Sequence, residues 1–396
     1  MFRVDDANRG NLKDTHKPAK EGAQGEYVYT ARMGEVYMFV EVKTSGDLDP
    51  FTDPPGDATP PEYRFTIDTE QLYPGDEVSQ HRVSALGQNT RYAHLIQTRQ
   101  FRTCLYSISI TGTTARLLRW ERSGAIVTES FNYKSNPNIL LEFVWRFSKA
   151  TNEERGFDCS AHAVESVEER QKFYSAIKRH VGEQLPGLST KEIEEEVDKH
   201  FWPGAITRLT VGAGEDARKI LVSRPMFTSK GATGRSTVGY WGLDCDFDEV
   251  VFVKDVWRTD VPGVSMEGAV MEKLLEAGVR NVPAVVCHGD VLHNGEAGSL
   301  ITVKLGAQGL TLRDEGHTQT TRTNEFAGKD WVKSLHPTKQ EYRPIPRIHY
   351  RLVTKCAGFR LSTFKGTREL LSATYDASIG TGIDHHVKPS LNTSTL

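Results

Sequence analysis

A lysine that directly follows a run of apolar residues is the feature that most constrains how this chain folds. The run is Val250-Val-Phe-Val253, and Lys254 comes next. Such a run of β-branched and aromatic residues predicts a strand, 249–255, that is covered on both faces. A surface lysine on an amphipathic strand is the alternative, and the three consecutive apolar neighbours disfavour it. A predicted helix, 267–277, opens with Glu267 and also carries Glu272, and either carboxylate is a candidate partner for Lys254.

The elements around Lys254 follow a defined order along the chain. A strand precedes a glycine-bearing turn, and the strand with the lysine, the helix with Glu267 and two further strands follow. The expected ranges are 219–227, 231–242, 249–255, 267–277, 282–287 and 349–355. This is the order of a protein-kinase small lobe. In that lobe the lysine holds the α- and β-phosphates of ATP and the helix glutamate pairs with it.

The glycine turn supports the same interpretation more weakly. Gly234 and Gly239 stand where backbone amides could approach phosphates, but their spacing is not that of G-x-G-x-x-G. The predicted nucleotide-binding residues are therefore Gly234, Gly239, Lys254 and Glu267.

A second constellation lies near the N-terminus. Residues 35–43 predict a strand that ends in Glu41-Val-Lys43. Alternation places Glu41 and Lys43 on one face, where the carboxylate could ligate Mg²⁺ and the ammonium could stabilise charge at a scissile phosphate. A solvated strand end is the alternative interpretation.

The order of elements after this strand resembles the restriction-endonuclease-like α/β core. A predicted helix, 77–99, carries Gln88, and a strand at 103–110 follows. In this resemblance Glu41 is the metal ligand, and Lys43 and Gln88 complete the site. The upstream aspartate of that pattern has no good match, because Asp5 and Asp6 lie in a polar segment that predicts no strand. This departure puts nuclease activity in doubt.

Composition excludes several classes of protein. The net charge of −3 argues against a globally basic nucleic-acid binder, so nucleic acid is not an expected partner. No stretch approaches the roughly 20 apolar residues of a membrane span, and the N-terminus lacks the apolar core of a signal peptide. The five cysteines show no CxxC spacing. Reduced thiols in a cytoplasmic or nuclear protein are therefore expected, with no membrane partner.

Long runs of the chain resemble the fungal-type protein kinase family over nearly its whole length. They are Arg102-Thr-Cys-Leu-Tyr-Ser-Ile-Ser-Ile-Thr-Gly, Ala115-Arg-Leu-Leu-Arg-Trp-Glu-Arg-Ser-Gly-Ala-Ile-Val, Leu141-Glu-Phe-Val-Trp-Arg-Phe-Ser, Val253-Lys-Asp-Val-Trp-Arg258, Glu267-Gly, Leu274-Leu-Glu-Ala-Gly-Val-Arg-Asn-Val-Pro283, Cys287-His-Gly-Asp-Val291 and His349-Tyr-Arg-Leu-Val-Thr-Lys355. The resemblance implies a kinase fold, ATP and Mg²⁺ as cofactors, and Ser/Thr-type phosphotransfer.

The chain departs from this family after a predicted helix at 362–378. The family continues into a catalytic loop of the His-Arg-Asp type and then a metal-binding Asp, whereas this chain runs on to Asp384-His-His. The general base and both Mg²⁺ ligands are therefore missing. We expect a truncated, pseudokinase-like chain with weak or absent ATP binding and no turnover. A non-catalytic scaffold for unknown protein partners, or a metal-dependent nuclease-like protein, are the alternatives.

The expected fold class is α/β and α+β, with an incomplete kinase fold. A restriction-endonuclease-like domain is expected at 1–150, a helical linker at 151–212, and a kinase-like small lobe with hinge and first large-lobe helix at 213–379. A disordered tail is expected at 380–396.

Overall fold

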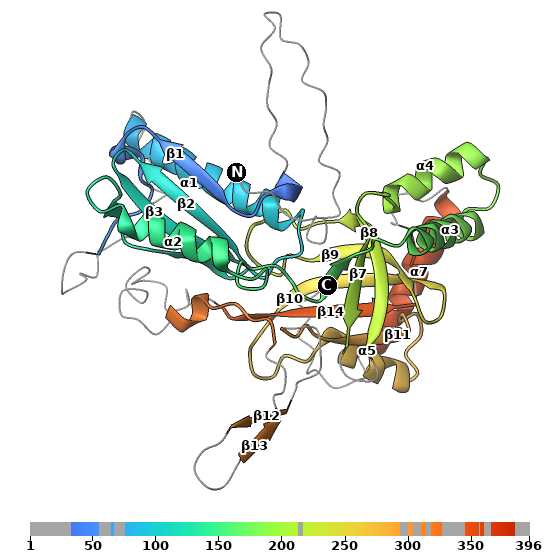
Figure 1. Ribbon diagram of the computed structural model, residues 1–396. Helices are drawn as coiled ribbons and strands as arrows, with labels where there is room; N and C mark the ends of the chain where they lie inside the picture. Colours follow the sequence, from blue (N-terminus) through green and yellow to red (C-terminus); the bar gives the residue numbers. More distant parts are fainter. Residues whose placement is uncertain are drawn as a thin grey trace, which may run out of the picture.

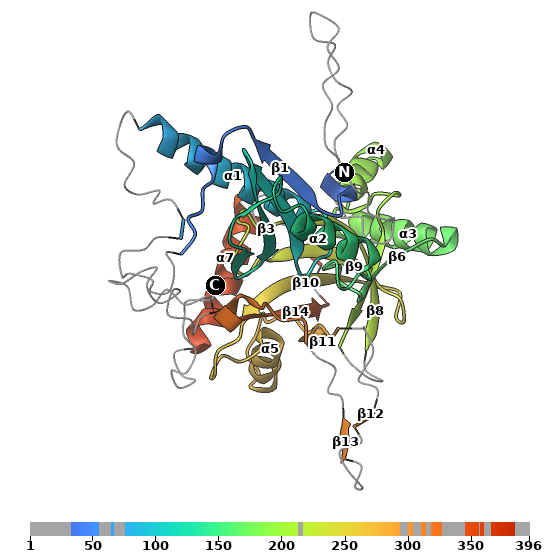
Figure 2. The ribbon, with the colours of Figure 1, turned by 60° about the vertical axis from the view of Figure 1, so that its left-hand side comes forward.

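The computed structural model of the 396-residue chain describes residues 33–54, 65–66, 76–212, 217–293, 300–303, 310–313, 318–326, 345–355, 357–359 and 366–384. Within these residues the chain forms two main sheets with helices packed on them (Figure 1 and Figure 2).

The N-terminal unit is built on a mixed sheet in the order β1-β2-β3-β4, with β5 also paired to β3. Its strands are β1 (Phe39–Lys43), β2 (Leu105–Thr111), β3 (Thr114–Glu121), β4 (Gly124–Val127) and β5 (Phe131–Asn132). Strands β1 and β2 run parallel, and helix α1 (Glu77–Gln97) lies between them in sequence. This is a strand-helix-strand connection, as expected for parallel neighbours.

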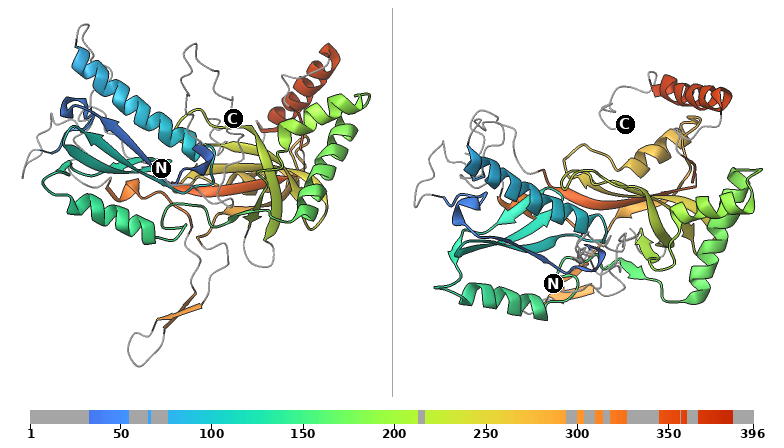
Figure 3. Two further views of the ribbon diagram at one scale, coloured as in Figure 1. Left: turned by 45° about the horizontal axis from the view of Figure 1, so that its top comes forward. Right: turned by 90° about the horizontal axis from the view of Figure 1, so that it is seen from above.

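Two helices cover the two faces of this sheet (Figure 3). Ala93 and Ile96 of α1 are buried against Leu105 of β2 on one face. Helix α2 (Asn138–Lys149) places Phe147 against Ile108 of β2 on the other. The three-layer packing agrees with the expected α/β class, and the finer resemblance to a restriction endonuclease stays a prediction.

The second unit is a seven-stranded antiparallel sheet in the order β11-β14-β10-β9-β8-β7-β6. Its strands are β6 (Ala161–Ala163), β7 (Thr207–Val211), β8 (Arg218–Phe227), β9 (Val238–Asp244), β10 (Glu249–Thr259), β11 (Val285–Asp290) and β14 (Arg347–Thr354). The predicted lysine strand is β10, an interior strand of this sheet between β14 and β9.

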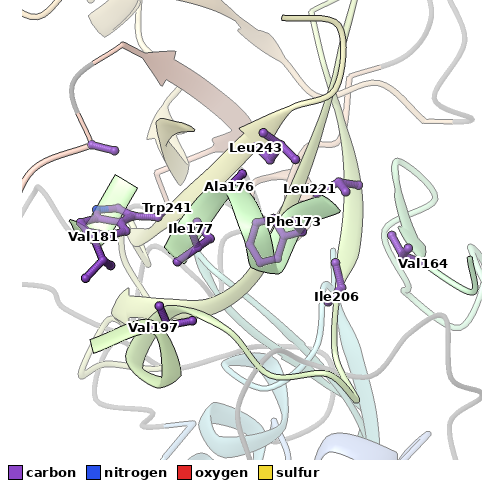
Figure 4. Packing of buried hydrophobic residues seen from close by; sticks show 11 residues of the cluster. Val164, Phe173, Ala176, Ile177, Val181, Val197, Ile206, Leu221, Trp241 and Leu243 are labelled. Atoms are coloured by element: carbon purple, nitrogen blue, oxygen red, sulfur yellow. The ribbon is translucent and has the colours of Figure 1, made fainter. Parts of the chain in front are cut away.

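Helices α3 (Val167–Gln184) and α4 (Thr190–His200) form a hairpin on one face of the second sheet. They separate near Pro186-Gly187, and Ser189 forms a capping box with Glu192 at the start of α4. Phe173 and Ile177 of α3 belong to the same buried cluster as Trp241 of β9, which is fully buried (Figure 4).

The remaining elements lie around β11 and β14. Helix α5 (Glu267–Glu276) precedes β11, and α7 (Thr367–Asp384) follows β14. A two-stranded antiparallel sheet, β12 (Leu300–Val303) and β13 (Leu310–Arg313), lies between β11 and β14 in the sequence. None of the described helices has the length and apolar character needed to span a bilayer.

The structure corrects three details of the expected organisation. The glycine turn was expected to reach residue 242, but β9 begins at Val238, because Tyr240, Trp241 and Leu243 bury apolar surface in the sheet. Strands β6 and β7 lie within 151–212, expected as a helical linker, and they extend the second sheet. Helix α7 continues to Asp384, into the expected tail; residues 385–396 lie outside the described residues.

A buried ionic network connects the segment that follows α2 to the second sheet. Arg351 of β14 has a side chain with no exposure and bonds Asp158 at 2.5 Å and Asp255 at 2.8 Å. His349 Nε2 lies 2.8 Å from Asp255 Oδ1, and Gln319 bonds both His349 and Asp158. The network satisfies charges that would otherwise be costly to bury.

Candidate functional site

Lys254 and Glu267 form an ion pair between β10 and α5. Lys254 Nζ lies 2.6 Å from Glu267 Oε1 and 2.7 Å from Oε2, and the two side chains are 21% and 36% exposed. Glu272, the competing carboxylate, instead lies 3.4 Å from His288. Of the two candidate partners, Lys254 therefore pairs with Glu267, and its side chain stays partly exposed.

Close approach of α5 to the sheet makes this pair possible. Gly268, the second residue of α5, has no side chain, and a Cβ there would overlap the His288 ring on β11. The Gly268 amide donates a 2.8 Å hydrogen bond to the Tyr350 hydroxyl of β14. Glu267 also lies in the first turn of the helix, where the dipole favours a carboxylate.

The two predicted glycines have local structural roles. Gly234 adopts φ +101°, a conformation that favours glycine, and its amide donates a 2.7 Å hydrogen bond to the Arg122 carbonyl of the N-terminal unit. A Cβ on Gly239 would overlap the Phe227 ring of β8. Contact of either glycine with a phosphate stays a prediction.

Arg235, beside Gly234, is a second cation at the Lys254 pair. Its Nη2 lies 3.5 Å from Glu267 Oε2, and its carbonyl accepts a 2.8 Å hydrogen bond from the Trp257 amide. Glu267 therefore contacts two cations, Lys254 and Arg235.

The N-terminal constellation also comes together. Lys43 Nζ lies 2.8 Å from Glu41 Oε1 and donates a hydrogen bond to Gln88 Oε1 of α1. The side chains of Glu41 and Lys43 are 13% and 24% exposed. Asp5 and Asp6 lie outside the described residues. Among those that are described, no group of three or more His, Cys, Asp or Glu side chains could hold a metal ion.

The geometry of β10 and α5 agrees with the comparison to known families. Residues 73–381 match the family model described as fungal protein kinase. The chain belongs to the fungal protein kinase family. The match includes α1 and the second sheet but not Glu41 or Lys43, so the family assignment does not depend on the N-terminal constellation. No curated protein and no solved structure matches the chain.

Sequence reasoning missed several residues of the kinase-like site. Gly268 follows Glu267 directly, and a glycine inside a predicted helix is a signal of close packing. Arg235 stood within the predicted turn as a basic residue between two glycines. The role of the Arg122 carbonyl had no sequence signal, because any residue can supply a backbone acceptor.

Proposed function

We propose that β10, α5 and the glycine turn form the phosphate-anchoring side of a kinase-type ATP site. The observation that carries this proposal is the two-point ion pair of Lys254 with Glu267. An ammonium has three donors, and Glu267 holds the lysine side chain in place while leaving a donor for a phosphate oxygen. In kinases this pair positions the nucleotide for transfer.

The residues fit ATP better than they fit its metal ions. Lys254 suits a polyphosphate, whereas the described residues contain no cluster of acidic ligands for Mg²⁺. Bound Mg²⁺ would neutralise the phosphates during transfer. The 396 residues also contain no His-Arg-Asp sequence to supply a general base. We therefore propose that this chain holds ATP weakly and does not transfer its phosphate unaided.

Nucleotide titration of the purified 396-residue chain tests the proposal. We expect ATP to bind the wild type weakly and to lose binding in Lys254→Met. Lys273→Met is the matched control, because Lys273 is an exposed lysine of α5. Equal binding by Lys254→Met and the wild type would contradict the anchoring role. Phosphate transfer to a protein substrate that depends on Lys254 would contradict the proposed inactivity.

A metal-dependent nuclease-like site is a second candidate, favoured by the contacts of Lys43 with Glu41 and Gln88. With Glu41 as the one carboxylate of the three residues, the site would hold a divalent ion weakly. The candidate requires Mn²⁺-dependent cleavage of plasmid DNA that is lost in Glu41→Gln. Absence of cleavage by the wild type at saturating Mn²⁺ would exclude it.

A further inference from the structure

A partly enclosed cavity lies between the N-terminal unit and the second sheet. It contains about 420 Å³ of space not filled by atoms, including its opening to solvent. Its walls are the segment after α1, the turn between β3 and β4, the glycine turn, and strands β9, β10 and β14. Asp255 and Trp257 of β10 line it, and alternation along the strand places both on the face opposite Lys254. The cavity is therefore separate from the proposed nucleotide site.

Arg122 brings a buried positive charge to this cavity from the turn between β3 and β4. The residue is 5% exposed, and its guanidinium donates to Gln97, from Nη2 to the carbonyl at 2.9 Å and from Nη1 to Oε1 at 3.5 Å. Among the described residues its Nε has no hydrogen-bond partner, and no carboxylate forms an ion pair with it. Burial lowers the pKa of Arg122 to about 10. A buried charge without a counter-ion is costly, so this position favours an anion.

The glycine turn supplies a second unpaired donor to the cavity, the hydroxyl of Ser236. The residue is 6% exposed, and its Oγ has no hydrogen-bond partner within the part of the chain that the structure describes. Ser236 has φ +46°, a left-handed conformation that a residue with a side chain adopts at a cost. The Gly234 amide, two residues earlier, donates its hydrogen bond to the Arg122 carbonyl. This bond holds the turn against the residue that supplies the buried guanidinium.

The nearby carboxylates belong to a network whose charges balance one another. The Gln319 amide donates to Asp158, so its oxygen accepts a hydrogen bond from His349 Nδ1. Nε2 of the same ring lies 2.8 Å from Asp255 Oδ1, and an ionised carboxylate can only accept. His349 therefore donates from both ring nitrogens and carries a positive charge. Two cations, His349 and Arg351, thus balance the two carboxylates, and the guanidinium at the turn between β3 and β4 remains in excess.

From these contacts we propose that the cavity binds a small free oxyanion, of the size and charge of phosphate or sulfate, through Arg122 and Ser236. A guanidinium recognises such an ion through charge-assisted N–H bonds, and the serine hydroxyl adds a donor from the glycine turn. Both residues are nearly buried, which favours a small ion over a phosphate carried on a larger molecule. The bound ion would join the glycine turn to the N-terminal unit. This inference does not depend on the proposed function, because Lys254 does not line the cavity.

Isothermal titration calorimetry of the full 396-residue chain with inorganic phosphate tests this site. We expect saturable binding, from which sulfate displaces phosphate and chloride at the same concentration does not. Arg122→Gln and Ser236→Gly should each weaken phosphate binding about tenfold, because each removes a donor to the ion. Ser236→Gly should not lower the melting temperature, since glycine adopts a positive φ without strain. This variant therefore carries the test if Arg122→Gln fails to fold.

Two control variants should bind phosphate as the wild type does. Lys254→Met removes the lysine of the proposed nucleotide site, and Arg280→Gln removes an exposed arginine. Loss of phosphate binding in Lys254→Met would assign the ion to the nucleotide site and overturn the cavity site. Displacement by chloride would overturn the oxyanion class. No saturable binding by the wild type, as for a cavity that holds water only, or unchanged binding in Arg122→Gln and Ser236→Gly, would overturn the inference while the ATP proposal stands.

Discussion

Strand β10 carries ion pairs on both of its faces, and the two faces differ in burial. Lys254 pairs with Glu267 on one face, where the side chains are 21% and 36% exposed. The next residue, Asp255, points to the other face and pairs with Arg351, whose side chain has no exposure. The buried pair cannot lose a partner without leaving a charge away from water, whereas the exposed pair can exchange a partner for a ligand.

The ion pairs on the buried face of β10 join the segment after α2 to the second sheet. Asp158 belongs to the segment after α2, and Asp255 and Arg351 belong to neighbouring interior strands of the second sheet. Burial by itself would raise the pKa of Asp255, but the charges of His349 and Arg351 and their hydrogen bonds outweigh it and lower the pKa to about 2. Burial would also raise the pKa of Asp158, but the charges of Arg351 and then His349, together with hydrogen bonds, outweigh it and lower that pKa.

The largest effect is expected when the buried network loses its arginine. Arg351→Met would leave Asp158 and Asp255 buried without their cation, so the free energy of unfolding should fall by about 3–5 kcal/mol. Urea unfolding followed by tryptophan fluorescence measures this change. Arg280→Met, at an exposed position, should change the free energy of unfolding by less than about 0.5 kcal/mol. Equal free energies of unfolding for the two variants would show that the buried ion pairs of β10 do not stabilise the fold.

Acid should destabilise the protein through the same network. The folded-state pKa of Asp255, about 2, lies below its unfolded value, so the folded chain binds fewer protons. Its contribution, roughly 2 kcal/mol, is present above about pH 5 and is lost as the pH falls toward 2. Urea midpoints at pH 7, 5, 4 and 3 should show this loss, and Asp255→Asn should depend less on pH over that range. A steeper pH dependence in Asp255→Asn would contradict the assignment.

A smaller loss is expected at Gly268, where the exposed face depends on close packing. Gly268→Ala places a methyl group against His288, so it should cost about 1–3 kcal/mol of stability and move Glu267 away from Lys254. Thermal unfolding and ATP titration measure the two effects. In Gly182→Ala of α3 the added methyl meets open space, so this control should stabilise the protein slightly. Unchanged ATP binding in Gly268→Ala would show that the spacing of α5 does not position Glu267.

The smallest change in stability is expected at the Lys254 pair itself. Glu267→Gln should change the free energy of unfolding by less than about 1 kcal/mol, because both side chains are partly exposed. It should nevertheless weaken ATP binding, since Lys254 loses the group that orients it. Parallel urea unfolding and ATP titrations separate the two effects. A loss of stability as large as that of Arg351→Met would make the pair structural.

Local sequence patterns determined much of the secondary structure and the Lys254 pair. The apolar run before Lys254 predicted a strand covered on both faces, and the structure has β10 there, between β14 and β9. The order of the elements gave Glu267 and Glu272 of one helix as candidate partners of the strand lysine, and the structure shows that Lys254 pairs with Glu267. Glu41, Lys43 and Gln88 were brought together by the same reasoning, from strand alternation and the order of the elements.

Only the tertiary structure decided which ion pairs are buried and where the glycine turn is anchored. Asp158 and Arg351 are far apart in sequence, and neither lies in a pattern that names a partner. The short strands β6 and β7 are placed by pairing, β7 with β8 and β6 with β7, since a few residues carry too little periodicity to be recognised alone. The Arg122 carbonyl that accepts the hydrogen bond from the Gly234 amide is a backbone group, so any residue type at position 122 could supply it. Contacts of this kind join segments that are far apart in the sequence, and only folding of the chain brings those segments together.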